Sequence, residues 1–465
     1  MQVTDLQGAK LYVPYEKLEK NTITEVKYRL LDSIISFIGG ALSLPGNDLK
    51  ALCNTLDRVS DIRPVYPTGL KTSLEMAGFL NAYILRSADW GDTYRRKDGI
   101  FGHPSDQVAA ILALCDNTKV SGKKVIELTH LAYQLFALLG EYMPGLRQPW
   151  DYTSALSLNI PVLSGICFND SPEKIQNALN LSASGGAVLH QVRTNEVTNL
   201  KSGASAYAIA RGFWCHRISG AITAPGGMFE GEDGWYKTIA PLEGELIGPG
   251  RDITYTPVEV KTFPCFHVGQ ASVECASSLH QKLKGDIDNI NQIIIHVSEV
   301  YSKRIIRTNQ HRYPESQPDA DHHLKYCVAT SLQYGALTPL HYNSKYLQDN
   351  KTRRIIDIIE IKVLTNNNKL TELGRQDDAC ILQIFMDNGS LVQDSRTKAK
   401  GSFFGLDTEK RLIQLREIIE KKQQMLEEIS GINLAPVSKL VSELENHSGC
   451  NLLDKIQESF LENIY

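Results

Sequence analysis

The sequence predicts an α+β protein in which a large helical domain is completed by helices from the end of the chain. Apolar residues recur at helical spacing through most of residues 20–240, and strand-like alternation is confined to about 255–400. A long amphipathic helical pattern then returns. We therefore expect a helical domain over 1–255, a smaller α+β lid domain over 256–402, and C-terminal helices over 403–465 that pack back on the helical domain.

Start and stop signals mark several helices of the first domain. Thr22 and Glu25 have the spacing of a capping box, ahead of an apolar stripe that ends at Gly39 and Gly40. Ser171 and Pro172 are typical of the N-cap and first position of another helix. These signals predict an all-helical domain, with further helical patterns at 45–58, 70–86, 105–116, 122–140, 153–166 and 203–219.

Alternating apolar residues predict three or four strands in the lid domain. Strand patterns cover 292–300, 356–364 and 379–386, and Asn388-Gly389 after the last of them is a strong hairpin signal. Helical patterns at 268–283 and 318–335 lie between the strands.

The C-terminal helices begin with a clear cap. Asp407 precedes a long run with one apolar stripe, and Gly431 ends it. Because a small sheet domain cannot bury this stripe alone, we expect it to face the helical domain.

Composition excludes several classes of protein. The formal net charge is −4 and the charges are dispersed, which argues against a nucleic-acid partner. No apolar run approaches 18 residues, so no membrane span is expected. The nine cysteines are scattered without a C-x-x-C pair, which argues against a zinc module or a disulfide framework. The first residues lack the pattern of a signal peptide, so we expect a cytoplasmic protein.

The segment 88–106 is the richest in reactive side chains. It places Asp89, Thr93, His103 and Asp106 within 18 positions, between two apolar helical patterns. Taken alone, a connection rich in glycine and charge is usually a solvated surface loop. Loops on a rigid scaffold are also where catalytic groups are found, so an active site is the alternative.

Three later segments offer cations and acid–base groups. Lys201 precedes a helix of small residues, whose N-terminus favours anions, and Lys261 and His267 flank a proline at the predicted domain junction. Taken alone, each is more typical of a solvated lysine or a boundary turn. His322 and His323 are adjacent, so on a helix they point about 100° apart and form a poor metal pair. Tyr326 is expected on the inward face of that helix.

Together these segments resemble the MmgE/PrpD family, in family order over roughly residues 20–400. The Gly-His-Pro-Ser-Asp form of the first motif is most similar to the 2-methylcitrate dehydratase branch, and cis-aconitate decarboxylases share the fold and much of the pocket. The matching motifs are Asp89-x-x-Asp-Thr93, Gly102-His-Pro-Ser-Asp106, Lys201-Ser-Gly203, Lys261-x-Phe-Pro264 with His267, and Asp319-Ala-Asp-His-His-x-x-Lys-Tyr326.

The resemblance implies a pocket between the helical and lid domains, a homodimer, and no metal or organic cofactor. It implies site roles for seven positions, of which the last is carried over least directly: Asp89, Thr93, His103, Lys201, Lys261, Tyr326 and His267.

The same residues suit chemistry on a tricarboxylate. Lys201, Lys261 and Arg193 can supply cations for carboxylates. Elimination of water beside a carboxylate needs a base and an acid, and the candidates are His103 with Asp89, and Tyr326, with the direction left open.

The predicted function is a cofactor-independent lyase that dehydrates 2-methylcitrate or a related small polycarboxylate. A cis-aconitate decarboxylase is the first alternative, because decarboxylation needs the same cations and a proton donor. A non-catalytic, binding member of the family is the second, because residues 145–152 lack a histidine that many members carry.

Overall fold

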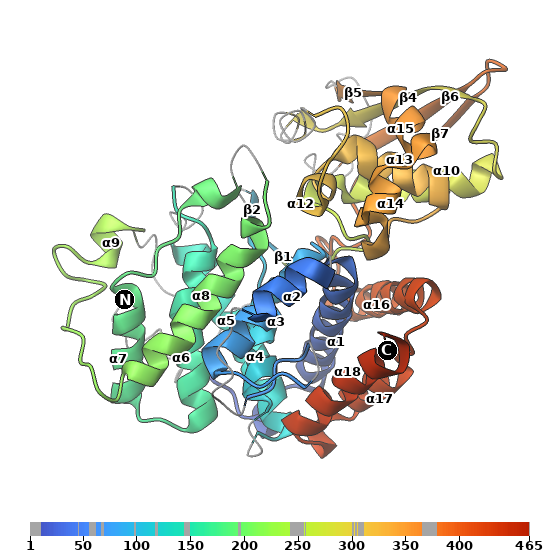
Figure 1. The fold of residues 1–465 in the computed structure, drawn as a ribbon. Coiled ribbons are helices and arrows are strands. Elements are labelled where there is room, and N and C mark those ends of the chain that lie inside the picture. Colours follow the sequence, from blue (N-terminus) through green and yellow to red (C-terminus); the bar gives the residue numbers. More distant parts are fainter. Residues whose placement is uncertain are drawn as a thin grey trace.

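The structure is a computed structural model, and its content of helices with two small sheets confirms the predicted α+β class (Figure 1). It describes residues 11–464 apart from 45, 55–61, 67–68, 97–98, 117–119, 144–148, 194–196, 242–254, 256, 300–301, 303–304, 306–310 and 365–378. None of the helices in this described part of the chain is long and apolar enough to cross a membrane.

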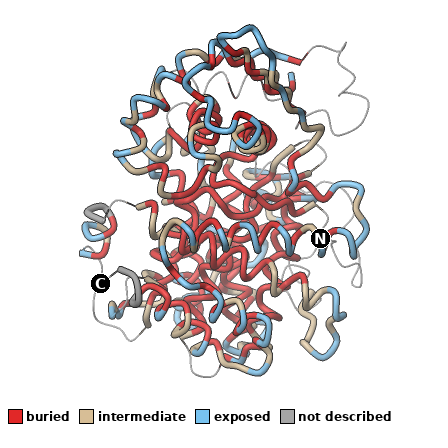
Figure 2. The backbone as a smooth tube through the Cα atoms, turned by 90° about the vertical axis from the view of Figure 1, so that its right-hand side faces the viewer, coloured by how far each residue is buried: buried red, intermediate tan, exposed pale blue. Residues whose placement is uncertain are grey.

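Helices α1 to α9 form the larger part of the molecule. Every residue of helix α4 is buried and, after Asp106 and Gln107, the helix is apolar on all sides, so the other helices enclose it. Figure 2 shows buried backbone running through this part from one side to the other. The bounds are α1 (Lys20–Ser43), α2 (Gly46–Asn54), α3 (Leu74–Ser87), α4 (Asp106–Leu114), α5 (Gly122–Tyr142), α6 (Thr153–Phe168), α7 (Pro172–Ala183), α8 (Leu200–Ile218) and α9 (Trp235–Thr238).

The expected capping box at the start of α1 is wrong. The helix begins at Lys20, so Thr22 and Glu25 lie inside it. The Glu25 carboxylate instead accepts hydrogen bonds from two buried guanidinium groups, Arg29 in the next turn and Arg411 near the end of the chain. Charge-assisted hydrogen bonds from these buried cations stabilise the carboxylate more than capping a solvated helix end would.

The expectation of an all-helical first domain is also wrong at the segment 88–106. Strands β1 (Thr93–Arg96) and β2 (Gly99–Gly102) form an antiparallel pair there, and β3 (Val258–Glu259) joins the other edge of β1. Tyr94 and Phe101 anchor the pair by packing edge-on against Phe136 of α5, with ring centroids 6.3 and 5.2 Å away. Packing of these aromatic side chains therefore buries a segment that, from its charges, was expected to be a solvated surface loop.

The lid domain contains a four-stranded sheet in the order β5-β4-β6-β7. Strand β4 (Ile290–Val297) is parallel to β5 (Ile359–Val363) and antiparallel to β6 (Cys380–Met386), which forms the predicted hairpin with β7 (Leu391–Arg396). Helix α10 (Gln270–Leu283) packs against β6 and β7.

The predicted helix 318–335 is divided in two. The short α12 (Gln317–Ala320) ends before Asp321, and α13 (Leu324–Tyr334) begins after His323. The imidazole of His323 caps α13 by accepting a hydrogen bond from the backbone N–H of Tyr326. Helices α14 (Ser344–Leu347) and α15 (Asn350–Asp357) follow.

The chain ends in α16 (Thr408–Ser430), α17 (Ala435–Ser442) and α18 (Gly449–Ile464), which lie beside α1 in Figure 1. The ammonium group of Lys422 on α16 is fully buried, pairs with Asp32 of α1 and donates a 2.8 Å hydrogen bond to the carbonyl of Trp90. The division of the chain at 255 and 402 stays a prediction, and residues 242–254 and 256 lie outside the described part.

Candidate active site

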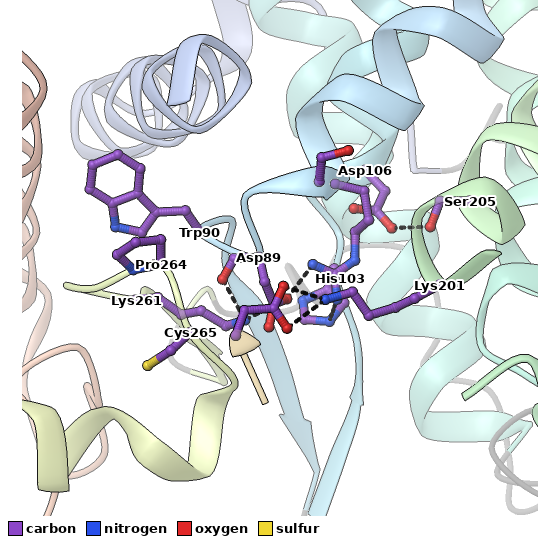
Figure 3. Close-up of polar contacts among 12 residues, drawn as sticks. Asp89, Trp90, His103, Asp106, Lys201, Ser205, Lys261, Pro264 and Cys265 are labelled. Atoms are coloured by element: carbon purple, nitrogen blue, oxygen red, sulfur yellow. Dashed lines mark hydrogen bonds and ion pairs between the residues drawn. The ribbon is translucent and has the colours of Figure 1, made fainter. Parts of the chain in front are cut away.

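Three cationic side chains and two carboxylates meet in a buried cluster, here called the charge cluster. It forms where the end of α3, the first turn of α8, the segment after β3 and the α12–α13 connection converge (Figure 3). None of the five residues is more than 4% exposed. The members are Arg86, Asp89, Lys201, Lys261 and Asp321.

Asp89 is at the centre of the charge cluster. It follows the C-terminus of α3 with a φ of 47°, a left-handed conformation that aspartate tolerates better than most residues. Its carboxylate pairs with Arg86 and lies 2.9 Å from the Nζ of Lys261, which also donates a 2.9 Å hydrogen bond to the Asp89 carbonyl. Burial raises the pKa of Asp89, but Lys261 and Arg86 outweigh it and hold the pKa well below its usual value.

The ammonium group of Lys261 is unusually acidic. Burial lowers the pKa of Lys261 to about 8, with Asp89 opposing the shift and Arg86 adding to it. The side chain is therefore largely protonated at neutral pH, yet a far better proton donor than a solvated lysine.

His103 is fixed through both ring nitrogens. Its Nδ1 lies 2.6 Å from the carbonyl of Asp92, which can only accept, so Nδ1 carries the proton. Its Nε2 lies 2.7 Å from an Nη of Arg86 and accepts a hydrogen bond from it. Burial, with Arg86 and Lys261, holds the pKa of His103 well below its usual value, so the ring is neutral.

Lys201 and Asp321 join the helical part to the lid. The Nζ of Lys201 donates to both carboxylate oxygens of Asp321, at 2.9 and 2.7 Å. Asp321 also accepts a hydrogen bond from Nδ1 of His322, whose ring stacks on Phe266 at 5.6 Å. Burial and Lys201 lower the pKa of His322 to about 4, with Asp321 opposing the shift.

A second polar group lies beside the charge cluster. Asp106, at the start of α4, accepts a 2.6 Å hydrogen bond from Ser205 of α8 (Figure 3). It also accepts a 2.8 Å hydrogen bond from Tyr152. Burial raises the pKa of Asp106. These bonds lock α4 to α8, the helices that carry the His103 and Lys201 segments.

Tyr326 and His267, both predicted site residues, are engaged elsewhere. The hydroxyl of Tyr326 donates to the carbonyl of His341, inside the lid. The Nε2 of His267 lies 2.8 Å from the Glu259 carboxylate and 2.6 Å from Arg95. No described contact joins Tyr326 or His267 to Asp89 or to either lysine of the charge cluster.

Thr93 and Arg193 lie near the charge cluster without entering it. Thr93 is buried on β1, and its hydroxyl has no hydrogen-bond partner among the described residues. Arg193 pairs with Asp151 at 2.8 Å and lies over the ring of Tyr152. The ring of His103 also packs against Tyr152, with a centroid distance of 5.4 Å. Arg193 is thus separated from His103 by one aromatic ring.

Sequence reasoning did not assign Arg86, Asp321 or His322 to the site. The one available signal for Arg86 was its position three residues before Asp89, close enough for an ion pair on a helical turn. Asp321 and His322 belong to the motif at 319–326. In that motif the adjacent histidines were considered only as metal ligands.

The arrangement opposes a metal ion. Asp89, Asp321 and His322 do bring possible ligand atoms within 4.8 Å of one another. Both carboxylates are already paired with the cations of the charge cluster, which would repel a further positive ion. The neighbouring His323 is committed to capping α13 through one nitrogen and to the carbonyl of His311 through the other.

Comparison with known proteins identifies the family. The chain is 24% identical over 308 residues to 2-methylcitrate dehydratase of Escherichia coli (strain K12), covering 62% of this chain and 61% of that protein. It is 23% identical over 309 residues to 2-methylcitrate dehydratase of Salmonella typhi, covering 62% of each. The chain thus spans less than two thirds of the length of these relatives. Residues 11–244 match the MmgE/PrpD N-terminal domain and residues 263–432 match the MmgE/PrpD C-terminal domain, so the chain belongs to the MmgE/PrpD family.

Proposed function

We propose that this protein is a lyase that dehydrates a small polycarboxylate, 2-methylcitrate or a close analogue, with its own side chains and no cofactor. The observation that carries the proposal is the charge cluster, in which three buried cations converge from segments far apart in the chain. Relatives named 2-methylcitrate dehydratase support the choice of substrate.

The charge cluster suits an anionic substrate. Its three cations face two carboxylates, which leaves one positive charge in surplus (3 − 2 = 1) beside two neutral histidines. A substrate carboxylate binds by replacing Asp89 or Asp321 as the partner of a cation, with charge-assisted hydrogen bonds of similar strength. Thr93, with its free hydroxyl, and Arg193, one ring away, are proposed to contact the more distant parts of the substrate.

Elimination of water follows from the protonation states in the site. A neutral imidazole, His103 or His322, accepts the proton from the carbon next to the hydroxyl-bearing carbon. The electron pair of that C–H bond forms the double bond and the C–O bond breaks. Lys261 gives its proton to the departing hydroxyl, which leaves as water. Tyr326 and His267 are proposed to support the lid rather than to transfer protons, because each is bonded elsewhere.

The proposal is tested by assaying the purified protein with 2-methylcitrate, citrate and cis-aconitate, following ultraviolet absorbance of the unsaturated product and release of CO2. We expect absorbance to rise with 2-methylcitrate and no CO2 to appear. Release of CO2 from cis-aconitate would instead identify a decarboxylase.

Binding of these acids without turnover, in a protein that melts cooperatively, would identify a non-catalytic member. Lys201→Met should raise KM steeply by removing one cation of the charge cluster. Lys410→Met, an exposed lysine at the start of α16, is the control and should leave KM unchanged.

We also propose that the protein forms a homodimer through one face of α8. Leu200, Tyr207 and Trp214 recur every seven residues along this helix and are 53%, 64% and 50% exposed. Leu189 and Ile222, more than half exposed, lie just before and after α8 in the chain. An apolar stripe with heptad spacing is self-complementary about a two-fold axis, which favours a second copy of this chain as its partner.

A further inference from the structure

The two neutral histidines of the site, His103 and His322, differ in how many of their ring nitrogens form hydrogen bonds. We infer that His322, rather than His103, is the base that removes the carbon-bound proton, and that Asp321 is its positioning residue. This inference rests on the proposed function, and it assigns a role to a pair that the sequence motif left without one.

His322 keeps one ring nitrogen available. Its Nδ1–H donates to the carboxylate of Asp321, which leaves the lone pair on Nε2. Among the described residues, Nε2 has no hydrogen-bond partner, and the side chain retains 9% exposure. The adjacent His323, by contrast, uses both nitrogens.

Both ring nitrogens of His103 already form hydrogen bonds. Its proton is bound to the carbonyl of Asp92 and its lone pair accepts from Arg86. To act as a base it would have to release Arg86, which would move a cation away from Asp89 at the moment when an anion must be held. We therefore assign His103 to the positioning of Arg86.

The position of His322 fits proton removal from a bound substrate. It places a ring nitrogen within 4.8 Å of a carboxylate oxygen of Asp89, the group that a substrate carboxylate would displace from Lys261. A carbon next to such a carboxylate then lies beside the imidazole.

Asp321 holds His322 in the orientation that the reaction needs. Its carboxylate is anchored by Lys201, and its carbonyl accepts a 2.8 Å hydrogen bond from the N–H of Phe266. Phe266 in turn stacks on the His322 ring. As the imidazole becomes imidazolium, the adjacent carboxylate stabilises the new charge, the role of the aspartate in an Asp–His pair.

The proton balance of the step closes within the site. The Nε2 of His322 gains the proton from carbon, Lys261 loses one to the leaving hydroxyl, and water and the unsaturated acid are formed. Exchange of one proton from His322 to solvent and one from solvent to Lys261 restores the resting state.

The test compares three glutamine variants in the dehydratase assay. His322→Gln should lower kcat about 100-fold or more, the usual share of general base catalysis, with KM within about threefold of wild type. His103→Gln should chiefly raise KM, because Arg86 loses its support. His216→Gln is the matched control, since His216 forms another Asp–His pair, 2.6 Å from Asp170, outside the site, and it should change neither constant.

Imidazole rescue separates a lost base from a damaged fold. His322→Ala leaves a cavity of the right size, so added imidazole should restore activity in proportion to its unprotonated fraction, and it should not restore His103→Ala. A wild-type kcat in His322→Gln, or no rescue of a His322→Ala protein with an intact melting transition, would overturn the assignment. A wild-type protein that turns over none of the three acids would instead overturn the proposed function itself.

Discussion

Lys261 combines a buried ammonium group with a pKa of about 8, so we expect the proposed reaction to be sensitive to alkaline pH. Above that pH the side chain loses both its charge and the proton it donates. We expect kcat/KM to be level from pH 6.5 to 7.5 and to fall about tenfold per pH unit above pH 8. Steady-state assays from pH 6.5 to 9.5 measure this.

Lys261→Arg is the control for that profile. Arginine keeps its charge throughout this range, so the variant should have low activity, for want of a proton donor, and no alkaline decline. A wild-type profile that stays level to pH 9.5 would show that Lys261 is not the acid.

Asp89 is predicted to stabilise the fold as well as to serve the reaction. Asn at this position tolerates the left-handed backbone and has nearly the same shape, but it leaves Lys261 and Arg86 without their carboxylate. Because unpaired buried charges are costly, Asp89→Asn should lower the free energy of unfolding by about 3–5 kcal/mol in urea titrations. Asp407→Asn, at the exposed N-cap of α16, should be close to neutral, since either residue caps a helix.

At the residue scale, the sequence predicted four residues of the site and missed the residues that complete it. Asp89, His103, Lys201 and Lys261 were predicted, and the structure brings them together. Asp321 reaches Lys201 across 120 positions, and spacing along the chain carries no information about such a contact. The hydrogen bond of Tyr326 to the carbonyl of His341, beyond the end of α13, could not be predicted for the same reason.

Helix α16 stabilises the site through one lysine, Lys422. Lys422 pairs with Asp32 of α1 and donates to the carbonyl of Trp90, directly after Asp89. Burial lowers the pKa of Lys422, with Asp32 opposing the shift. Lys422→Met should cost about 3–5 kcal/mol of stability by leaving Asp32 buried without a cation.

The same variant should also lower kcat, because the turn at Asp89 loses a hydrogen bond that fixes it. Lys410→Met on the exposed side of α16 should change stability by less than about 1 kcal/mol. Equal effects of the two substitutions, measured by urea unfolding, would contradict a special role for Lys422.

At the element scale, helical periodicity located α3, α5, α7 and α10 within a few residues, whereas the β1–β2 pair was missed. Four residues per strand are too few for alternation to be distinguished from a loop. Arg95 on β1 is buried and paired with Glu259 of β3 at 2.9 Å. That partner comes from 164 positions downstream.

At the scale of the whole molecule, the proposed dimer can be broken by one charge. Tyr207→Glu places a carboxylate in the middle of the α8 stripe, and we expect it to convert a dimer into monomers in light-scattering measurements. Ile413→Glu changes a similarly exposed apolar residue on α16 and should leave the dimer intact. A wild-type monomer, or a Tyr207→Glu dimer, would contradict the proposed interface.

The buried neutral histidines also predict how stability depends on pH. The pKa of His322 is about 4 in the folded protein and about 6.5 in an unfolded chain, so below pH 6.5 the unfolded state binds a proton that the folded state does not. The free energy of unfolding should therefore fall as pH drops from 6.5 to 4, by about 3 kcal/mol from His322 alone, at 1.36 kcal/mol per unit. Urea titrations at several pH values across this range should show that the free energy of unfolding depends less steeply on pH in His322→Gln than in wild type.

The order of helical, α+β and helical segments followed from periodicity alone, because each segment carries its own apolar pattern. The amphipathic stripe of the last segment also predicted that this segment packs on the first. The residues that join the two segments were not predictable from a local pattern, because Arg411 and Lys422 meet Glu25 and Asp32 almost the whole chain away.

The hydrogen bond from Lys422 to Trp90 has a consequence for the making of the protein. The two residues are 332 positions apart, and a ribosome releases the N-terminal one long before the other. The turn that carries Asp89 therefore emerges without its support and waits while most of the remaining chain is synthesised. Nascent chains stalled before residue 422 should hold folded helices and yet lack the proposed activity, which we expect to appear only once α16 has been synthesised.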